Sequence, residues 1–194
     1  MNEASFRNSY LLMRHGESDA NASGVIVSDP KIGSEHFGLT ERGSKEIIAS
    51  AKGFTGGAIT QIVCSDFLRT LQTARLVADT LNLPQPEKEE GLRERFFGDW
   101  DGMSAEHYEN IWQRDDAGKQ SDDHVESPEA VLKRGLNVLT RLEQEHQGQV
   151  ILLISHGDML QILSTSFAGI APHKHRSLAH HQTSEIKRLV PKNA

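Results

Sequence analysis

The chain has 194 residues and a formal net charge of −6 at pH 7, and 37% of its residues are hydrophobic. This length is typical of one domain, and the acidic balance disfavours a nucleic-acid surface, because such surfaces usually carry clustered Lys and Arg. No stretch reaches the roughly 18 apolar residues of a membrane span or resembles a signal peptide, and the single cysteine, Cys64, precludes an internal disulfide, so we expect a cytoplasmic protein that binds neither nucleic acid nor membranes.

The first predicted element is a buried strand at residues 10–13, because consecutive apolar residues without polar alternation are typical of a strand covered on both faces. Arg14, His15 and Gly16 follow it directly. Ligands of α/β sheets bind beyond the carboxyl ends of the strands, so we expect Arg14 and His15 at the mouth of a site. Residues 18–37 are rich in Ser, Gly, Asp and Asn without a periodic pattern, which predicts a long surface loop near that site.

Two helices and a strand are predicted next. Thr40 is a suitable N-cap for a helix from residue 41 to about 52, and residues 61–64 form a second apolar strand. Between residues 67 and 81 apolar side chains recur every three or four positions, which predicts an amphipathic helix. Arg69 lies near the start of this helix, where it could reach the tip of the first strand; an exposed arginine without a role is the alternative.

The middle of the chain is highly charged. Residues 87–95 contain four glutamates, and charge alone cannot choose a functional one among them. Residues 98–127 are polar and predict an excursion that covers the site. Trp100 and Trp112 either line a substrate pocket in it or anchor it to the body of the domain, and anchoring is the favoured interpretation.

The last third of the chain predicts a long helix, a second buried strand and a further helix. Ser127 and Pro128 are typical of a helix start, and this helix is expected to run to about residue 146. The apolar residues 150–154 predict a strand that delivers a second histidine, His156, to the edge where the first one lies. The helix that follows is expected to end near Gly169.

The segment from residue 173 to residue 181 contains four histidines. No cysteine lies near them, and their spacing matches no ligand pattern of a zinc site. A polar loop is therefore predicted here, in preference to a metal site. A short final strand is predicted within residues 183–190.

Two imidazoles and two guanidiniums thus come to one edge of the predicted sheet, from Arg14, His15, Arg69 and His156. The planar fork of arginine matches phosphate oxygens bidentately, and a neutral imidazole can act as a nucleophile. These side chains together indicate a site for a phosphoryl group.

The segment Arg14-His15-Gly16-Glu17-Ser18, followed by Asn21, resembles the signature of the histidine phosphatase superfamily, also called the phosphoglycerate mutase-like family. Later blocks resemble those of the family in the same order, namely Leu39-Thr40-Glu41-Arg42-Gly43, Ser65-Asp66 with Arg69-Thr70 and Thr73-Ala74, Leu92-Arg93-Glu94 with Gly98 and Gly102, and Ser155-His156-Gly157-Asp158. The match covers residues 10 to about 165. It implies an α/β fold, a three-layer α/β/α sandwich with a mainly parallel central sheet, in a single domain over residues 1–194.

The resemblance also implies a mechanism. The implied site residues are His15, Glu94 and His156 for catalysis and Arg14, Asn21 and Arg69 for substrate binding. His15 would attack phosphorus, and Glu94 would protonate the departing alcohol; a salt bridge to Arg93 or Arg95 is the alternative role for Glu94. Neither a metal ion nor another cofactor is expected.

The predicted activity is that of a phosphomonoester hydrolase acting on a small phosphorylated metabolite, and phosphoglycerate mutase-type phosphoryl transfer is the alternative. Mutases of the family carry a lysine shortly after the block that residues 97–102 resemble, and later a tryptophan followed by paired arginines. Here Ala105 stands near the first place, and Trp112-Gln113-Arg114 offers one arginine at the second. Fewer cations favour the entry of water to a phosphohistidine.

Two further alternatives belong to other classes. Cys64 and Arg69 faintly resemble the phosphate loop of protein tyrosine phosphatases, but their spacing is one residue short and the stretch lacks glycine. A catalytically inactive module that binds phosphorylated partners is the second alternative. It is disfavoured because every expected catalytic position holds a competent residue.

Overall fold

The computed structural model describes residues 6–119 and 122–190. Its centre is a five-stranded sheet in the order β3, β2, β4, β1, β5, and the strands are β1 (Ser9–Arg14), β2 (Gln61–Cys64), β3 (Glu87–Lys88), β4 (Val150–Ser155) and β5 (Ile186–Arg188). The pairs β3–β2, β2–β4 and β4–β1 are parallel, and β5 is antiparallel to β1. The mainly parallel sheet predicted from the sequence is confirmed. The short strand β3 was not predicted, because it lies within the charged run.

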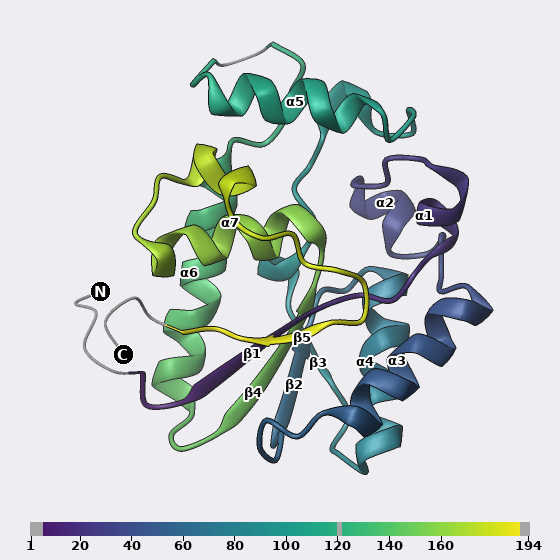
Figure 1. The fold of residues 1–194 in the computed structure, drawn as a ribbon, viewed down its shortest axis with the longest axis vertical. Coiled ribbons are helices and arrows are strands. Elements are labelled where there is room, and N and C mark those ends of the chain that lie inside the picture. Colours follow the sequence, from purple (N-terminus) through teal and green to yellow (C-terminus); the bar gives the residue numbers. More distant parts are fainter. Residues whose placement is uncertain (1–5, 120–121, 191–194) are drawn as a thin grey trace.

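Helices cover both faces of the sheet and complete the three layers (Figure 1). The four long helices are α3 (Glu41–Gly53), α4 (Leu68–Leu81), α6 (Pro128–Glu145) and α7 (Gly157–Ala168). Apolar side chains of α3 and α4 pack on one face, and those of α6 and α7 pack on the other. The α/β/α sandwich expected from the sequence is therefore the observed architecture.

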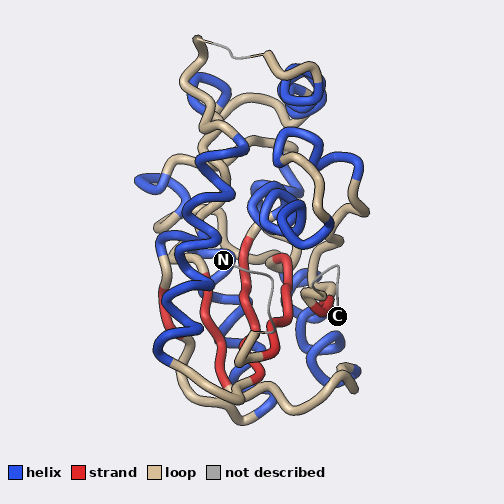
Figure 2. The backbone as a smooth tube through the Cα atoms, turned by 90° about the vertical axis from the view of Figure 1, so that its left-hand side faces the viewer, coloured by secondary structure: helices blue, strands red, loops and turns tan. Residues whose placement is uncertain are grey.

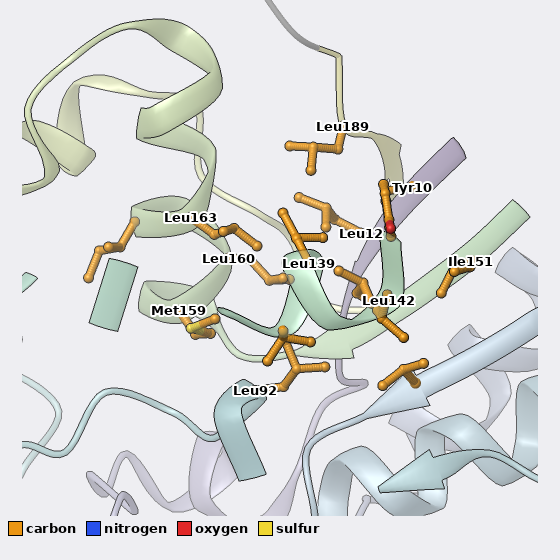
Figure 3. Close-up of a cluster of buried hydrophobic side chains, with 14 of the residues drawn as sticks. Tyr10, Leu12, Leu92, Leu139, Leu142, Ile151, Met159, Leu160, Leu163 and Leu189 are labelled. Atoms are coloured by element: carbon orange, nitrogen blue, oxygen red, sulfur yellow. The ribbon is translucent and has the colours of Figure 1, made fainter. Parts of the chain in front are cut away.

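The strands divide their apolar residues between two cores, because successive side chains point to opposite faces. Leu11 and Met13 belong to the core under α3 and α4. Tyr10 and Leu12 belong to the core under α6 and α7, where they lie near Leu160 (Figure 3). Burial on both faces explains the uninterrupted apolar runs that mark these strands in the sequence.

The main helices begin at the predicted caps. The Thr40 hydroxyl accepts a hydrogen bond from the Gly43 backbone N–H at 2.9 Å and starts α3. The Ser127 side chain accepts one from Ala130 at 3.2 Å, with Pro128 in the first turn of α6. Gly169, in the left-handed conformation at φ +66°, ends α7.

The loop predicted for residues 18–37 contains two short helices, and this part of the prediction is wrong. They are α1 (Asp19–Ser23) and α2 (Pro30–Gly33). Ser18 and Asn21 form a capping box at the start of α1, and the Asp29 side chain accepts a hydrogen bond from Lys31 at the start of α2. Helices of five and four residues are too short to show an apolar period.

The excursion predicted for residues 98–127 lies beyond one end of the sheet (Figures 1 and 2). Within its described residues it holds a 3₁₀ helix, η2 (Gly98–Trp100), and the helix α5 (His107–Asp116); residues 120 and 121 lie outside the described part. Ile111 packs with Ile26 and Phe97 in a small third core. The excursion is thus attached to the domain by apolar contacts of its own.

Two further 3₁₀ helices are η1 (Glu90–Leu92) and η3 (Pro172–Ser177). The second corrects the polar loop predicted for the histidine-rich segment. His175 and His181 are 0% and 5% exposed, because η3 packs against α7 and brings His175 within 3.8 Å of Asp158. Across the described ranges, no helix combines the length and apolar character needed to cross a membrane.

Candidate active site

The two predicted histidines meet at the carboxyl ends of neighbouring strands. The register of β1 and β4 places Arg14 opposite Ser155, so the next residue of each strand is one of the histidines. The rings of His15 and His156 are 5.2 Å apart between centroids. Both side chains are buried, with 3% and 0% of their surface exposed.

Arg69 joins the two histidines. It lies in the first turn of α4 and is 4% exposed, so the exposed arginine considered from the sequence is ruled out. Its Nε donates a hydrogen bond to His15 Nε2 at 3.1 Å. Its Nη2 lies 3.0 Å from His156 Nδ1 and donates to the Val27 carbonyl at 3.0 Å.

These contacts define the tautomers of both rings. His15 Nδ1 lies 2.7 Å from the Gly16 carbonyl oxygen, which accepts but cannot donate, so Nδ1 carries the proton and Nε2 keeps its lone pair. His156 Nδ1 faces the Arg69 donor and is therefore an acceptor, while Nε2 donates to Ser65 Oγ at 2.9 Å. Both imidazoles are neutral in this arrangement.

The local electrostatics also favour neutral imidazoles. Burial lowers the pKa of His15 well below its ordinary value, and the positive charges of Arg69 and Arg14 lower it further. The pKa of His156 is lowered in the same way, first by burial and then by Arg69. For both histidines burial is the larger cause and the arginines are the smaller one.

Arg14 and Arg69 each have a buried donor without a partner. The atoms are Arg14 Nε and Arg69 Nη1, and neither side chain forms an ion pair with a carboxylate of the described residues. Burial lowers the pKa of Arg69 to about 10. A buried guanidinium that lacks both an anion and part of its hydrogen bonds is costly. The two arginines are thus arranged to bind an anion.

Glu94 is a carboxyl group that acts electrostatically on Arg14 and Arg69, because its negative charge opposes the lowering of their pKa by burial. Its Oε1 accepts hydrogen bonds from the backbone N–H groups of Arg95 at 3.0 Å and Met159 at 3.2 Å. Burial, followed by the negative charge of Asp158, raises its pKa. A carboxyl group with a raised pKa is suited to donate a proton near neutral pH.

The alternative role of Glu94, a salt bridge to Arg93 or Arg95, is wrong. Arg93 binds Asp66 at 2.6 Å instead, and Arg95 binds Asp115 at 2.5 Å. The Glu94 carboxylate is therefore left free of ionic partners from the neighbouring residues in the chain.

No contact joins Asn21 to the histidines or arginines in the described part of the chain. Its side chain is exposed, and its Oδ1 accepts hydrogen bonds from the Ser18 backbone and hydroxyl at 3.1 and 2.9 Å. Its role in phosphoryl binding stays a prediction.

Cys64 does not have the surroundings of a reactive thiol. It is fully buried in the core under α3 and α4, and burial raises its pKa to about 12. A thiol in such surroundings is not ionised and is a poor nucleophile. Cys64 is therefore a small hydrophobic residue of the core.

Gly43 and Gly16 allow α3 to approach the site loop closely. A Cβ atom on Gly43 would overlap the backbone of Glu17, and one on Gly16 would lie 2.5 Å from Ile47 Cδ1. The Gly16 N–H donates to Thr73 Oγ1 at 3.2 Å. The turn that carries His15 is therefore fixed between α3 and α4.

The excursion contributes aromatic side chains to the same region. Trp112 Nε1 donates to Asp158 of α7 at 3.0 Å and so anchors the excursion to the domain. Trp100 Nε1 donates to Asp123 within the excursion at 2.5 Å, and the Trp100 ring packs against the third core, which contains Ile26. Tyr108 stacks on Trp112 with 5.2 Å between centroids. Burial, followed by the negative charge of Glu94, raises the pKa of Tyr108.

Sequence patterns gave no role to Ser65, Tyr108 or Arg95. Ser65 directly follows β2, a position that signals a residue at the ligand-binding edge. Tyr108 and Arg95 depend on tertiary contacts that no local pattern encodes.

A cavity of about 450 Å³ lies between the excursion, the start of α6 and η3. It is lined by Arg95, Arg114, Asp115 and His173 among others, and includes none of the predicted site residues. In the described residues no group of three or more His, Cys, Asp or Glu side chains could hold a metal ion. The phosphoryl site is therefore identified by its chemistry and not by the volume of a cavity.

The family model of the histidine phosphatase superfamily (branch 1) matches residues 10–192. The chain belongs to this superfamily.

Curated relatives of the chain include both phosphatases and probable mutases. It is 29% identical to adenosylcobalamin/alpha-ribazole phosphatase of Escherichia coli (strain K12) over 168 residues, which is 82% of this chain and 78% of the relative. It is 29% identical to the probable phosphoglycerate mutase GpmB of Yersinia enterocolitica over 174 residues, 87% of this chain and 78% of the relative.

Solved structures share the fold. The Bacillus stearothermophilus protein YhfR superposes with a TM-score of 0.79 at 21% identity, covering 93% of this chain and 90% of that chain. A mycobacterial glucosyl-3-phosphoglycerate phosphatase with VO3 superposes with a TM-score of 0.78 at 20% identity, over the same shares of the two chains. These likenesses confirm the architecture predicted from the sequence.

Proposed function

We propose that this protein is a phosphomonoester hydrolase that acts through a phosphohistidine intermediate on a small phosphorylated metabolite. The observation that carries the proposal is the pairing of an available His15 Nε2 lone pair with the unpartnered donors of Arg14 and Arg69. A nucleophile and donors for an anion then lie side by side among buried side chains. The curated relatives named as phosphatases support the same activity.

The first chemical step forms a bond between His15 Nε2 and phosphorus while the bond from phosphorus to the ester oxygen breaks. Arg69 now donates its Nε–H to Nε2, so a phosphoryl oxygen takes over this donor before the attack. Protonated Glu94 gives its proton to the departing oxygen, and the alcohol leaves neutral.

The second step is hydrolysis of phospho-His15. Glu94, now a carboxylate, takes a proton from water while the water oxygen attacks phosphorus and the bond to Nε2 breaks. Orthophosphate leaves, and both His15 and Glu94 return to their starting protonation states. Arg14 and Arg69 stabilise the charge on the phosphoryl oxygens in both transition states. His156 joins them when a phosphoryl oxygen replaces Ser65 Oγ as the acceptor of its Nε2–H, and we assign Asn21 the role of orienting the group.

The choice of hydrolysis over mutase chemistry rests on the excursion. The arginine that follows Trp112 in the excursion is Arg114. It forms an ion pair with Asp123 at 2.6 Å and lies over the Trp100 ring. Arg114 is thus occupied, and Ala105 supplies no charge. The two positions that carry cations in mutases therefore supply no unpaired charge to a bisphosphorylated intermediate, which favours the entry of water to phospho-His15. Because curated relatives named as probable phosphoglycerate mutases also match this chain, mutase activity is the second candidate.

The test is a phosphate-release screen over a panel of phosphorylated metabolites, run with an assay for interconversion of 3- and 2-phosphoglycerate. We expect release without isomerisation. His15→Ala is expected to lower turnover by several orders of magnitude, and the matched control Cys64→Ser is expected to retain it. Rapid quenching during turnover should trap an acid-labile, base-stable phosphoryl group on His15.

Each alternative has its own outcome. Interconversion with negligible phosphate release identifies a mutase. Loss of activity in folded Cys64→Ser supports cysteine catalysis. Absence of any turnover, with retained binding of phosphate esters, identifies an inactive binding module.

A further inference from the structure

The non-exposed arginines of the described residues fall into two groups. Most of them form ion pairs with carboxylates, and these are Arg93, Arg95, Arg114, Arg134 and Arg141. The second group forms no ion pair with a carboxylate of the described residues and consists of Arg14, Arg69 and Arg176. All members of the second group lie around the candidate active site. Two guanidiniums suffice to bind one phosphoryl group, so the third cation needs a separate explanation.

Arg176 is held rigidly beside the site by η3. Its Nη1 donates to Gln161 Oε1 at 2.6 Å, and its guanidinium carbon lies 3.7 Å from the centroid of the Trp112 ring. The atoms Nε and Nη2 bind no acceptor of the described residues and are not among the fully buried atoms that lack a partner. Arg176 is therefore oriented but still has donors to offer a ligand.

His180 connects Arg176 to the phosphoryl site. Its Nδ1 lies 3.1 Å from Arg176 Nη1, and its Nε2 lies 2.8 Å from Arg14 Nη1. Both arginine atoms are donors, whereas a neutral imidazole accepts at one nitrogen and carries a proton on the other. One of the two contacts thus sets an N–H against an N–H. Without a ligand, this bridge is only half satisfied.

An anionic group is the ligand that satisfies this arrangement. It would accept hydrogen bonds from Arg176 and from the imidazole N–H that now faces a cation, and it would offset the two positive charges. Burial, Arg14 and Arg176 together lower the pKa of His180 to about 4. The imidazole is therefore neutral near pH 7, and the charge at this position comes from the arginines.

We propose that Arg176 and His180, next to Arg14, form a second anion subsite that binds a carboxylate or second phosphate on the alcohol part of the substrate. This inference rests on the proposed function, because the subsite is defined relative to the phosphoryl group at His15. Its position, one imidazole ring from Arg14, places the second anion close to the scissile phosphate. The substrate class is accordingly a compact phosphomonoester with two anionic groups.

Two matched substrate pairs distinguish the source of the second anion. 3-Phosphoglycerate and glycerol 3-phosphate differ in a carboxylate, and fructose 1,6-bisphosphate and fructose 6-phosphate differ in a phosphate. For each pair the measured quantity is the ratio of the two kcat/KM values. We expect the wild-type protein to favour the doubly anionic member of at least one pair, by about tenfold or more.

The deciding variant is Arg176→Gln, which keeps a polar side chain at the position but removes the charge. It is expected to lower the preference about tenfold, mainly through KM of the doubly anionic substrate. Arg75→Gln is the matched control, because Arg75 is exposed on α4, and it should keep the wild-type ratio. Arg176→Lys, which keeps the charge without the planar fork, is expected to be intermediate and serves if the glutamine variant does not fold.

The results separate the subsite from the activity itself. Turnover with equal preferences in wild-type and Arg176→Gln proteins overturns the subsite and leaves the phosphatase in place. Absence of turnover overturns the proposed function; calorimetric titration with 3-phosphoglycerate and glycerol 3-phosphate then tests the subsite directly. Tighter binding of 3-phosphoglycerate that is lost in Arg176→Gln supports it, and equal or absent binding of the two compounds refutes it.

Discussion

Replacement of Arg95 by methionine should severely destabilise the protein. Arg95 is 2% exposed and holds the excursion onto the domain. Its Nη1 and Nη2 donate to the Asp115 carboxylate at 2.5 and 2.8 Å, its Nη1 lies 3.5 Å from Asp158, and its Nε donates to the Glu126 carbonyl at 2.7 Å. Methionine fills much of the same volume but leaves two carboxylates without their cation.

The magnitude follows from the burial of the partners. Asp115 and Asp158 are 8% and 4% exposed, and removal of one member of a buried ion pair costs about 3–5 kcal/mol of stability. For a chain of this size each kcal/mol lowers Tm by about 2–4 °C. Arg95→Met should therefore lower Tm by about 6–20 °C.

The assay is thermal unfolding followed by circular dichroism, with two companion variants. Arg42→Met removes an exposed ion-paired arginine, since Arg42 is 74% exposed, and should leave Tm nearly unchanged. Arg95→Met combined with Asp115→Asn should recover part of the loss, because one uncompensated charge is then absent. Equal Tm values for Arg95→Met and Arg42→Met would refute the assignment of a buried charge network.

Two further predictions concern the site. Glu94→Gln keeps an acceptor for the Arg95 and Met159 N–H groups but removes the proton donor, so kcat for alkyl phosphates should fall by about 10²–10⁴; the loss for nitrophenyl phosphate should be much smaller, and equal losses would point to another acid. The buried histidines should make stability pH-dependent, because the lowered pKa of His156 lets the unfolded state bind a proton below about pH 6.5 that the folded state does not. The free energy of unfolding should then fall with decreasing pH by up to about 1.4 kcal/mol per pH unit for each such histidine. Urea unfolding at several pH values measures this dependence, and the plot of unfolding free energy against pH should be less steep for His156→Asn than for the wild-type protein. Equal steepness for the two proteins would contradict this prediction.

The sequence could predict the centre of the site because local signals specify it. An apolar run followed by a histidine marks both β1 and β4, and the rule for ligand position in α/β sheets then brings His15 and His156 to one edge. Arg69 follows from the same logic, since it lies in the first turn of the helix after β2. Each of these inferences needs only the neighbouring residues and the general geometry of parallel sheets.

The surroundings of the site could not be predicted in this way. In the charged run at residues 87–95 nothing in the sequence distinguishes the buried charged residues from the exposed ones among four glutamates and two arginines. In the structure Arg95 is buried, while the Glu90 side chain is 74% exposed. The difference arises from Asp115 and Asp158, which are distant in the chain. Charge patterns therefore indicate that a segment is polar without indicating whether its partners are water or other residues.

The histidine-rich segment shows why this limit bears on specificity. The sequence predicts a polar loop here, because polar histidines whose spacing matches no metal-ligand pattern are typical of exposed segments. In the fold, His180 instead contacts Arg14, 166 positions away in the chain, and Arg176 reaches Trp112 of the excursion. The parts proposed to bind the phosphoryl group thus come from strand ends and a helix start that can be recognised locally. The parts proposed to select the alcohol come from two segments that only the folded chain brings together, so relatives with the same signature can differ in substrate through residues outside it.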